Sequence, residues 1–281
     1  MHIRQMTRAD IDFAFACAQE EGWQSETQKD FEGFLIYNPT GCFVAGAGSE
    51  KIGICVATAY RDNGFIGELI IKKEHRGKGY GTQLFDFSIK YLAAKGIKNI
   101  YLDGDLAAVP IYEKAGFRKI DRSLRFAGKI PGKKQKNVRK VTPDDINTIC
   151  AIDRELFGDD RGFFLRRRFA MYSELCFVSE NNNRINGYLM ARPGHEVISV
   201  GPWVLLEPGE NPEALLAGLS LGTGDRMLRL GILESNTTAV GIIKSLQTFA
   251  ENEYCWRMVQ GPQEDLGMDK NLIAIGSAAK G

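Results

Sequence analysis

A glycine-rich run between a predicted strand and a predicted helix constrains this chain most. Residues 76–81 read R-G-K-G-Y-G. The apolar, β-branched stretch at 65–71 favours a strand, and apolar side chains recur at helical spacing within 82–92. Such a turn presents backbone N–H groups at the positive end of a helix, and its glycines let a ligand approach the main chain closely. The run therefore predicts a phosphate or pyrophosphate site, to which Arg76 and Lys78 add positive charge.

Two common phosphate-binding loops do not fit this run. A dinucleotide fingerprint, G-x-G-x-x-G, requires glycine where Thr82 stands, and the Walker pattern G-x-x-x-x-G-K-[ST] is absent. The run does match R-x-x-G-x-G, and in this it resembles the pyrophosphate loop of the GNAT acetyltransferases, which bind coenzyme A. An ordinary glycine-rich surface turn is the alternative interpretation.

A second motif lies where the resemblance requires it. A predicted strand at 99–103 is followed by P-I-Y-E-K-A-G-F at 110–117. The ending Y-E-K-x-G-F is similar to the GNAT motif in which a short helix lies beside the acyl thioester and ends at a glycine cap. The interval from Arg76 to Tyr112 leaves room for one long helix and one strand. Residues 1 to about 128 are therefore identified as resembling a GNAT N-acetyltransferase domain. The whole chain is similar to two-domain bacterial members with a divergent C-terminal half.

The chain contains the same unit twice. Residues 3–11 are echoed 135 positions later at 138–146, each time with a threonine N-cap and an acidic residue three positions on. Residues 42–45 are echoed 134 positions later at 176–179. With the resemblance, the repeat implies an α+β (α/β mixed sheet) fold of tandem GNAT-like domains, each a twisted mixed sheet flanked by helices. The expected division is a catalytic domain at 1–128, a basic linker at 129–137 and a degenerate GNAT-like domain at 138–281.

The second copy lacks the residues that the chemistry needs. The segment equivalent to the glycine loop, 210–215, has no glycines. Three carboxylates in it or just before it would repel a pyrophosphate: Glu207, Glu210 and Glu213. Tyr112 maps near Ile243. We therefore expect residues 138–281 to keep the scaffold, to have lost both halves of the active site, and to help line the acceptor pocket. Loops 20–32, 158–172 and 204–213 are expected to shape that pocket.

Composition excludes several classes of partner. The formal net charge is +1, which gives no pull toward nucleic acid or an anionic membrane. The six cysteines lack C-x-x-C spacing, so free, mostly buried thiols are expected, and the three histidines are too scattered to indicate a metal site. No apolar stretch approaches about 18 residues, and no signal peptide is recognisable. We expect a cytoplasmic protein that needs no metal and binds neither membrane nor nucleic acid.

Two basic runs have ordinary structural interpretations. The Gly, Pro and Lys content of 129–137 predicts an exposed linker; a nucleic-acid contact is the alternative, but no aromatic residues interleave the lysines. Arg166, Arg167 and Arg168 are predicted to lie on a solvated helix with one arginine leaning inward.

The resemblance assigns the coenzyme to the first copy. In the GNAT fold two neighbouring parallel strands diverge and the pantetheine arm inserts between them; here these strands would be 65–71 and 99–103. The main chain of Leu69, Ile70 and Ile71 would pair with pantetheine amides, as in strand addition. The remaining residues expected to bind the coenzyme are Arg76, Gly77, Lys78, Gly79, Tyr80, Gly81, Thr82, Asp105 and Tyr112. Asp105 stands where the family often has asparagine, which leaves its contact open.

The resemblance also proposes the catalytic pair. Tyr112 matches the general acid that protonates the departing thiolate, and the alternative is a half-buried structural tyrosine. Glu68 interrupts an apolar strand and is the candidate general base, with a solvated carboxylate as the alternative. Asp103, Asp105 or a chain of water molecules are further candidates for the base.

Together these features predict an enzyme, an acetyl-CoA-dependent N-acetyltransferase. Direct attack by the amine in a ternary complex fits, because neither motif contains a cysteine to carry the acyl group. The acceptor is expected to be a small amine or a peptide amino group, and the oligomeric state is left open. A non-catalytic acyl-CoA-binding regulator or sensor is the alternative.

Overall fold

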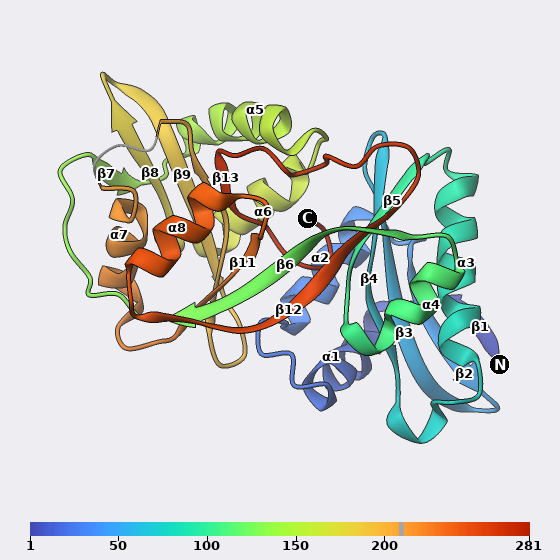
Figure 1. Ribbon diagram of the computed structural model, residues 1–281. Helices are drawn as coiled ribbons and strands as arrows, with labels where there is room; N and C mark the ends of the chain where they lie inside the picture. Colours follow the sequence, from blue (N-terminus) through green and yellow to red (C-terminus); the bar gives the residue numbers. More distant parts are fainter. Residues whose placement is uncertain (208–210) are drawn as a thin grey trace. The chain divides into compact units, whose positions relative to one another are not determined.

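The computed structural model describes residues 1–207 and 211–281, and the described chain divides into two compact units (Figure 1). The first unit comprises Met1–Ile120, Trp256–Glu264 and Ala278–Lys280, and the second comprises Asp121–Cys255, Asp265–Ser277 and Gly281. These units differ from the contiguous division at 128 and 138 that the sequence indicates. The reason is that two long strands, β6 (Arg118–Gly128) and β12 (Phe249–Gln260), each begin in one unit and end in the other.

The first unit is built on a mixed sheet with the strand order β1-β2-β3-β4-β5-β12. All neighbouring pairs are antiparallel except β4–β5, which is parallel. Helices α1 and α2 lie on one side of this sheet, and α3 and α4 on the other (Figure 1). The elements are β1 (His2–Gln5), α1 (Ile11–Glu20), α2 (Gln28–Tyr37), β2 (Cys42–Ala47), β3 (Glu50–Ala59), β4 (Asn63–Ile71), α3 (Tyr80–Ala94), β5 (Asn99–Gly104) and α4 (Val109–Lys114).

The second unit repeats this order with its own strands, β6-β11-β10-β9-β8-β7, and again has one parallel pair, β10–β11. A short strand, β13 (Leu272–Ala274), pairs with β10. The remaining elements are β7 (Val138–Lys140), α5 (Ile146–Phe157), α6 (Gly162–Tyr172), β8 (Cys176–Asn181), β9 (Arg184–Pro193), β10 (Ile198–Leu205), α7 (Ala214–Thr223), β11 (Leu228–Leu233) and α8 (Thr237–Ser245). The predicted repeat of a mixed sheet in two units is therefore confirmed.

The two copies begin with the same cap. Asp10 accepts hydrogen bonds from the N–H and hydroxyl of Thr7, both at 2.9 Å, and Asp145 does the same for Thr142 at 2.7 and 2.8 Å. Each aspartate also pairs with an arginine on the preceding strand at 2.7 Å, Arg4 or Arg139. The arginine is the main reason why the pKa of Asp10 falls well below its usual range and that of Asp145 falls to about 2. The predicted threonine caps are thus confirmed in both copies.

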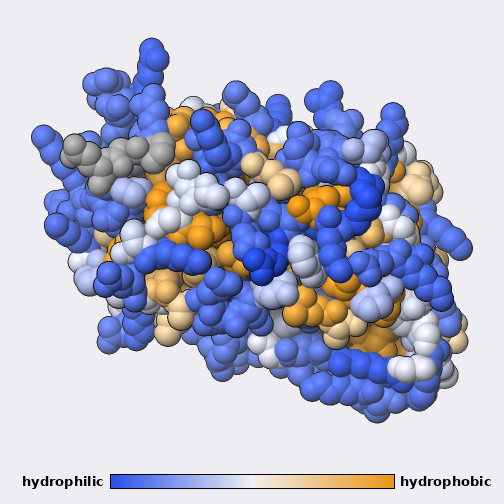
Figure 2. All heavy atoms as spheres, viewed as in Figure 1, coloured by the Kyte–Doolittle hydropathy of each residue, from blue (hydrophilic) through white to orange (hydrophobic). Residues whose placement is uncertain are grey.

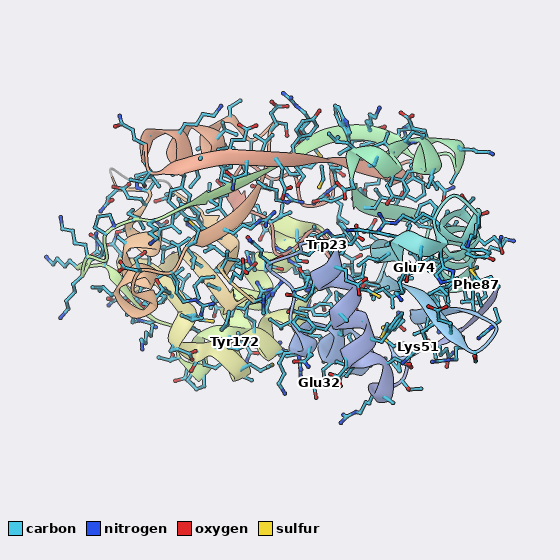
Figure 3. All side chains as sticks on the ribbon, turned by 90° about the horizontal axis from the view of Figure 1, so that it is seen from below. Trp23, Glu32, Lys51, Glu74, Phe87 and Tyr172 are labelled. Atoms are coloured by element: carbon cyan, nitrogen blue, oxygen red, sulfur yellow. The ribbon has the colours of Figure 1, made fainter. Side chains whose placement is uncertain are left out.

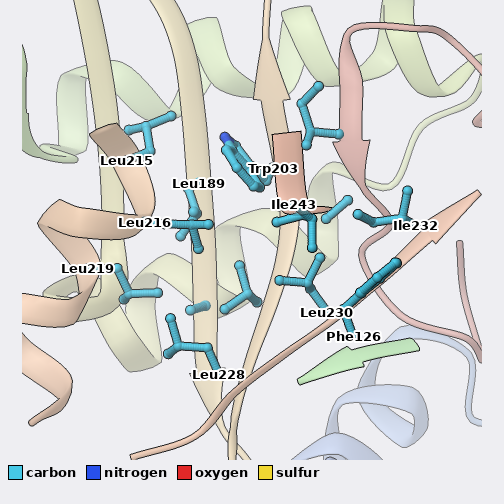
Figure 4. Close-up of a cluster of buried hydrophobic side chains, with 14 of the residues drawn as sticks. Phe126, Leu189, Trp203, Leu215, Leu216, Leu219, Leu228, Leu230, Ile232 and Ile243 are labelled. Carbon is cyan, nitrogen blue, oxygen red and sulfur yellow. The ribbon is translucent and has the colours of Figure 1, made fainter. Parts of the chain in front are cut away.

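The core of the second unit lies between its sheet and helices α7 and α8. Leu189 on β9 and Trp203 on β10 are fully buried and pack with Leu216 and Ile243 from the two helices (Figure 4). Helix α7 is buried on nearly all sides, and this explains why its sequence contains no charged residue.

Several smaller expectations are also confirmed. Five of the six cysteines are buried, and Arg168 is 7% exposed whereas Arg166 is exposed. Residues 129–137 are mostly exposed and form no helix or strand, but they lie within the second unit, so their role as a linker stays a prediction. Among the described residues no helix is both long and apolar enough to span a membrane. The face drawn in Figure 2 carries mainly hydrophilic side chains.

Candidate functional site

Strands β4 and β5 separate after three residue pairs. They are bonded at Asn63–Asn99, Gly64–Ile100 and Phe65–Tyr101, and no further pair follows in the described chain. Beyond this point β3 continues to pair with β4 as far as Ile71, and β12 pairs with β5 as far as Gly104. The facing edges of 66–71 and 102–104 are therefore left without a strand partner, which confirms the predicted divergence.

A cavity of about 460 Å³ lies along these edges and brings the two sequence motifs together. Every residue predicted for the site lines it except Lys78. The full lining is Glu21, Trp23, Ile66, Gly67, Glu68, Leu69, Ile70, Ile71, Arg76, Gly77, Gly79, Tyr80, Gly81, Thr82, Leu102, Asp103, Asp105, Ala107, Ala108, Ile111 and Tyr112. A volume of this size is typical of a small-molecule site.

The glycine loop ends the cavity at the start of α3. Gly77 and Gly79 have φ of 75° and 74°, a left-handed conformation that side chains with a Cβ rarely adopt. Gly79 is the N-cap of α3 and accepts a hydrogen bond from the N–H of Gln83 at 3.1 Å. The N–H groups of residues 80–82 precede this bond and, by helix geometry, have no acceptor within the helix. This arrangement favours an anion such as a phosphate.

Both basic side chains of the loop form hydrogen bonds to other parts of the first unit. Arg76 donates from Nε to the carbonyl of Ile71 at 2.8 Å and from Nη2 to the carboxylate of Glu21. Lys78 donates from Nζ to the carbonyl of Glu74 at 3.3 Å and does not line the cavity. The Lys78 side chain turns back along the loop, and its placement at the ligand stays a prediction. A direct contact between Arg76 and a phosphate stays a prediction.

Tyr112 is held in the cavity wall by close packing. Its side chain is buried, and its ring centroid lies 4.9 Å from that of Phe85 on α3. A Cβ added to Gly104 would lie 2.6 Å from Cε2 of Tyr112, so only glycine at 104 permits this ring position. Helix α4 ends at Lys114, and the predicted glycine follows its C-cap at Gly116, which has φ of 88°. Gly104 was not singled out from the sequence, because its contact with Tyr112 is made in three dimensions.

Glu68 occupies an irregular point on β4. The register between β3 and β4 shifts between Ile54 and Val56, so β4 carries an extra residue there, and Glu68 has φ of 54°. A positive φ at a residue other than glycine is strained, and such strain and such bulges concentrate at functional sites. The side chain is 4% exposed, yet Glu68 lines the cavity. The bulge thus places a buried acidic residue at an irregular point of the cavity wall.

The alternative bases are less well placed. The Asp103 carboxylate is fully buried in an ion pair with Arg257 and holds no position open to a substrate. Asp105 is exposed at the end of β5. No cysteine lines the cavity within the described chain, and burial raises the pKa of the Cys55 thiol to about 12. An acyl-cysteine intermediate is therefore not favoured.

Residues from α1 and the segment after it complete the cavity. Glu21 and Trp23 follow α1 and line the cavity, although they lie more than 50 positions before the glycine loop. Trp23 is labelled in Figure 3. Of the expected loops, 20–32 therefore contributes to the cavity. Glu210 and the rest of 208–210 lie outside the described residues, so their predicted role there is not described.

A group of potential metal ligands lies on the surface. Glu50, Glu74 and His75 bring ligand atoms within 4.8 Å of one another, although the histidines appear scattered in sequence. The ammonium of Lys72 lies 2.7 Å from Glu74 and 3.5 Å from Glu50, so a cation already occupies this group of carboxylates. None of these residues lines the cavity.

The equivalent slot of the second unit is filled by the chain itself. Strands β10 and β11 pair over three residues and then separate, as β4 and β5 do. Strand β13 lies beside the separated part of β10, with Trp203 opposite Ala274, and the N–H of Ile275 donates to the carbonyl of Gly231 on β11 at 3.0 Å. The main-chain edges that a pantetheine arm would use are therefore already bonded in this unit.

Two sequence models of known families match the chain. Residues 8–117 match a model described as the acetyltransferase (GNAT) family, and residues 149–273 match one described as an acetyltransferase (GNAT) domain. Each match falls on one of the two copies that the repeat indicates.

Curated relatives are similar to part of the chain. A glucosamine 6-phosphate N-acetyltransferase of Trypanosoma brucei brucei is 32% identical over 33% of this chain and 62% of that protein. The N-alpha-acetyltransferase 30 of Schizosaccharomyces pombe is 33% identical over 33% of this chain and 67% of that protein. A mycothiol acetyltransferase of Streptomyces bingchenggensis is 30% identical over 40% of this chain and 39% of that protein. The chain thus spans less than two thirds of the first and third relatives.

Solved structures share the fold over nearly the whole chain. A crystal structure from Pyrococcus horikoshii has a TM-score of 0.84 and 24% identity, covering 100% of this chain and 95% of that one. A tandem GNAT protein from the clavulanic acid biosynthesis pathway has a TM-score of 0.65 and 12% identity, covering 93% of this chain and 99% of that one. At these identities the likeness concerns the fold, and it agrees with two GNAT units in tandem.

Proposed function

This chain belongs to the GNAT acetyltransferase family, and we propose that it is an N-acetyltransferase that moves an acetyl group from acetyl-CoA to an amine within a ternary complex. The observation that carries the proposal is the continuity of one cavity. It runs from the glycine loop along the open edge of β4 to Glu68 and Tyr112. A site with an anion-binding end and a polar end of this kind suits a nucleotide thioester.

The first unit offers two kinds of backbone contact to the coenzyme. The N–H groups of residues 80–82 suit the pyrophosphate, because they point from a helix N-terminus with no internal acceptor. The free edge of Leu69, Ile70 and Ile71 suits the two amides of the pantetheine arm, which would add to β4 as a strand does. Arg76 then keeps the loop attached to β4 through the carbonyl of Ile71.

The proposed reaction is direct attack on the thioester. The lone pair of the amine forms a C–N bond with the carbonyl carbon, the C–S bond breaks, and the coenzyme leaves as a thiolate. Glu68 takes the proton that the attacking nitrogen loses, directly or through a water molecule. Tyr112 gives its hydroxyl proton to the thiolate. An ordinary phenol is about 1.5 pKa units weaker as an acid than a thiol, so this transfer costs about 2 kcal/mol.

The acceptor is proposed to be a primary amine, and the names of the relatives suggest which ones to test. The names of these relatives refer to an amino sugar, to an α-amino group and to a thiol metabolite. Release of coenzyme A should therefore be measured with amino sugars, with peptides that carry a free N-terminus and with small aliphatic amines. Turnover with one class and not the others would identify the acceptor class.

Tyr112→Phe distinguishes an enzyme from a non-catalytic acyl-CoA sensor. For the enzyme we expect kcat to fall about 100-fold or more, while calorimetry gives an unchanged Kd for acetyl-CoA. Tyr91→Phe is the matched control, because its hydroxyl bonds Asn38 at 2.8 Å outside the cavity. Unchanged turnover in Tyr112→Phe would refute the role as acid. Binding of acetyl-CoA without turnover of any amine would favour the sensor.

A further inference from the structure

Strand β12 holds the part of β5 that has left β4. Its residues Trp256, Arg257 and Met258 lie opposite Gly104, Asp103 and Leu102. These are the β5 residues that line the cavity or touch Tyr112. In the described chain β4 makes no pair with them, so β12 is the strand that fixes their distance from β4. The far wall of the first unit's slot thus depends on a segment more than 150 positions away in the sequence.

The contact at the centre of this support is a fully buried ion pair. Arg257 donates from Nε to Oδ1 of Asp103, and both side chains have 0% exposure. The guanidinium carbon lies 5.3 Å from the ring centroid of Phe65, the last β4 residue that pairs with β5. Neither Nη atom of Arg257 has a hydrogen-bond partner among the described residues. The ion pair therefore sits behind the wall, at the point where the two strands separate.

Stability alone does not account for this ion pair. Burying two charges carries a large desolvation penalty, and apolar residues of similar volume often replace such pairs without loss of stability. Two unpaired guanidinium nitrogens add to the penalty. Because the Asp103 side chain is fully buried while the residue lines the cavity, its main chain forms the wall. What the pair fixes is therefore the position of that main chain.

We propose that Arg257 is a positioning residue for acetyl transfer. Through the side chain of Asp103 it sets the main chain of residues 102–104 at the distance from β4 that the pantetheine arm requires. The same support reaches Tyr112, because Gly104 lies against its ring and Gln260 of β12 donates to the carbonyl of Ala115 at 2.8 Å, just after α4. The inference rests on the proposed function, since it assigns the coenzyme to this slot.

The test compares acetyl-CoA binding with thermal unfolding in the full chain. Arg257→Met removes one charge of the buried pair and leaves the Asp103 carboxylate buried, so we expect a lower Tm and a Kd for acetyl-CoA at least tenfold weaker. Arg257→Met combined with Asp103→Leu removes both charges, so we expect the Tm to recover while the Kd stays at least tenfold weaker. Arg257→Lys keeps the charge pair and is expected to bind within threefold of the wild type. Arg118→Met removes an exposed pair with Glu264 and is the control, with no expected change.

Two results would overturn the proposal. One is wild-type affinity for acetyl-CoA in the double variant, since the ion pair would then be dispensable for the slot. The other is an equal loss of affinity in Arg257→Lys and Arg257→Met, which would show that the charge pair does not set the slot. This second comparison can be made even if the double variant does not fold. Failure of the proposed function is distinguishable, because the wild type would then bind no acetyl-CoA while the Tm values still reported the coupling of the pair.

Discussion

The slot between β4 and β5 in the first unit and the slot between β10 and β11 in the second begin alike and end differently. Each pair of strands is bonded over three residue pairs and then separates. In the first unit a cavity follows the free edges; in the second, β13 and Ile275 occupy them. The comparison teaches that the separation of two parallel strands belongs to the scaffold, whereas an open edge belongs to the site.

The second slot also lacks two polar side chains that line the first, Glu68 and Tyr112. Glu68 at the bulge of β4 corresponds by the repeat to Pro202 on β10, where the register also shifts. Tyr112 corresponds to the neighbourhood of Ile243, which is fully buried in the apolar core. A proline and an isoleucine have no proton to exchange, so the second slot lacks acid and base as well as space.

The largest expected effect is on the filled slot. Trp203→Ala removes a fully buried indole from the core of the second unit (Figure 4). We expect the free energy of unfolding to fall by about 3–5 kcal/mol, as for other large-to-small core substitutions, measured by urea denaturation. Trp203→Phe is the control and is expected to lose little, because the indole Nε1 has no hydrogen-bond partner in the described chain.

The same variant tests whether the second slot fails to bind the coenzyme because the chain itself fills it. Calorimetry of the wild type and of Trp203→Ala is expected to give one acetyl-CoA per chain, because β13 still occupies the edge of β10 in the variant. Two sites in either protein would contradict the comparison. It would mean that the second slot opens for the coenzyme.

The next effect concerns the carboxylate that only the first slot has. Glu68→Gln keeps the shape of the side chain and removes its capacity to take a proton, so kcat is expected to fall by about 100- to 1000-fold. The Kd for acetyl-CoA should not change, because residues 69–71 and the glycine loop are untouched. Glu74→Gln, outside the cavity, is the control. Unchanged turnover would transfer the role of base to Asp105 or to water.

The sequence predicted those parts of the site that short motifs encode. The glycine loop and Tyr112 each lie in one continuous stretch whose spacing carries the geometry, and both line the cavity. Glu68 was found because a charge within an apolar strand is conspicuous. The direction of Lys78 was not predictable, since charge in a loop does not say where the side chain turns.

The parts that the sequence did not predict are made by distant segments. Arg257 reaches Asp103 across 154 positions, and nothing near either residue marks the contact. The sequence also did not predict that β6 and β12 each begin in one unit and end in the other. The alternation of apolar and polar residues in a strand does not show which sheet the strand joins. Strand β13 is three residues long, too short for periodicity to identify.

A smaller effect is expected where the first slot depends on the absence of a side chain. Gly104→Ala places a methyl group 2.6 Å from the ring of Tyr112, so the ring must move. We expect a loss of about 1–3 kcal/mol in stability from overpacking and about a tenfold lower kcat. Gly241→Ala on α8 is the control, because a Cβ there meets nothing within 4 Å. Normal kcat in Gly104→Ala would show that the ring position of Tyr112 does not matter.

The smallest effect should be equal in the two copies, because the caps are a feature that both retain. Asp10→Asn and Asp145→Asn are each expected to cost about 1 kcal/mol at pH 7, a figure kept low because the partner arginines are partly exposed. The pKa of Asp145 is about 2 in the folded chain, below the usual value of about 3.9 for an unfolded aspartate. The ionised carboxylate therefore stabilises the fold above pH 4, and this contribution is lost as the pH falls from about 4 to 2. Urea denaturation at pH 7 and pH 3 should show the wild type approaching both variants at the lower pH. A cost confined to one copy would mean that the two caps are not equivalent, although each pairs its aspartate with a threonine and an arginine.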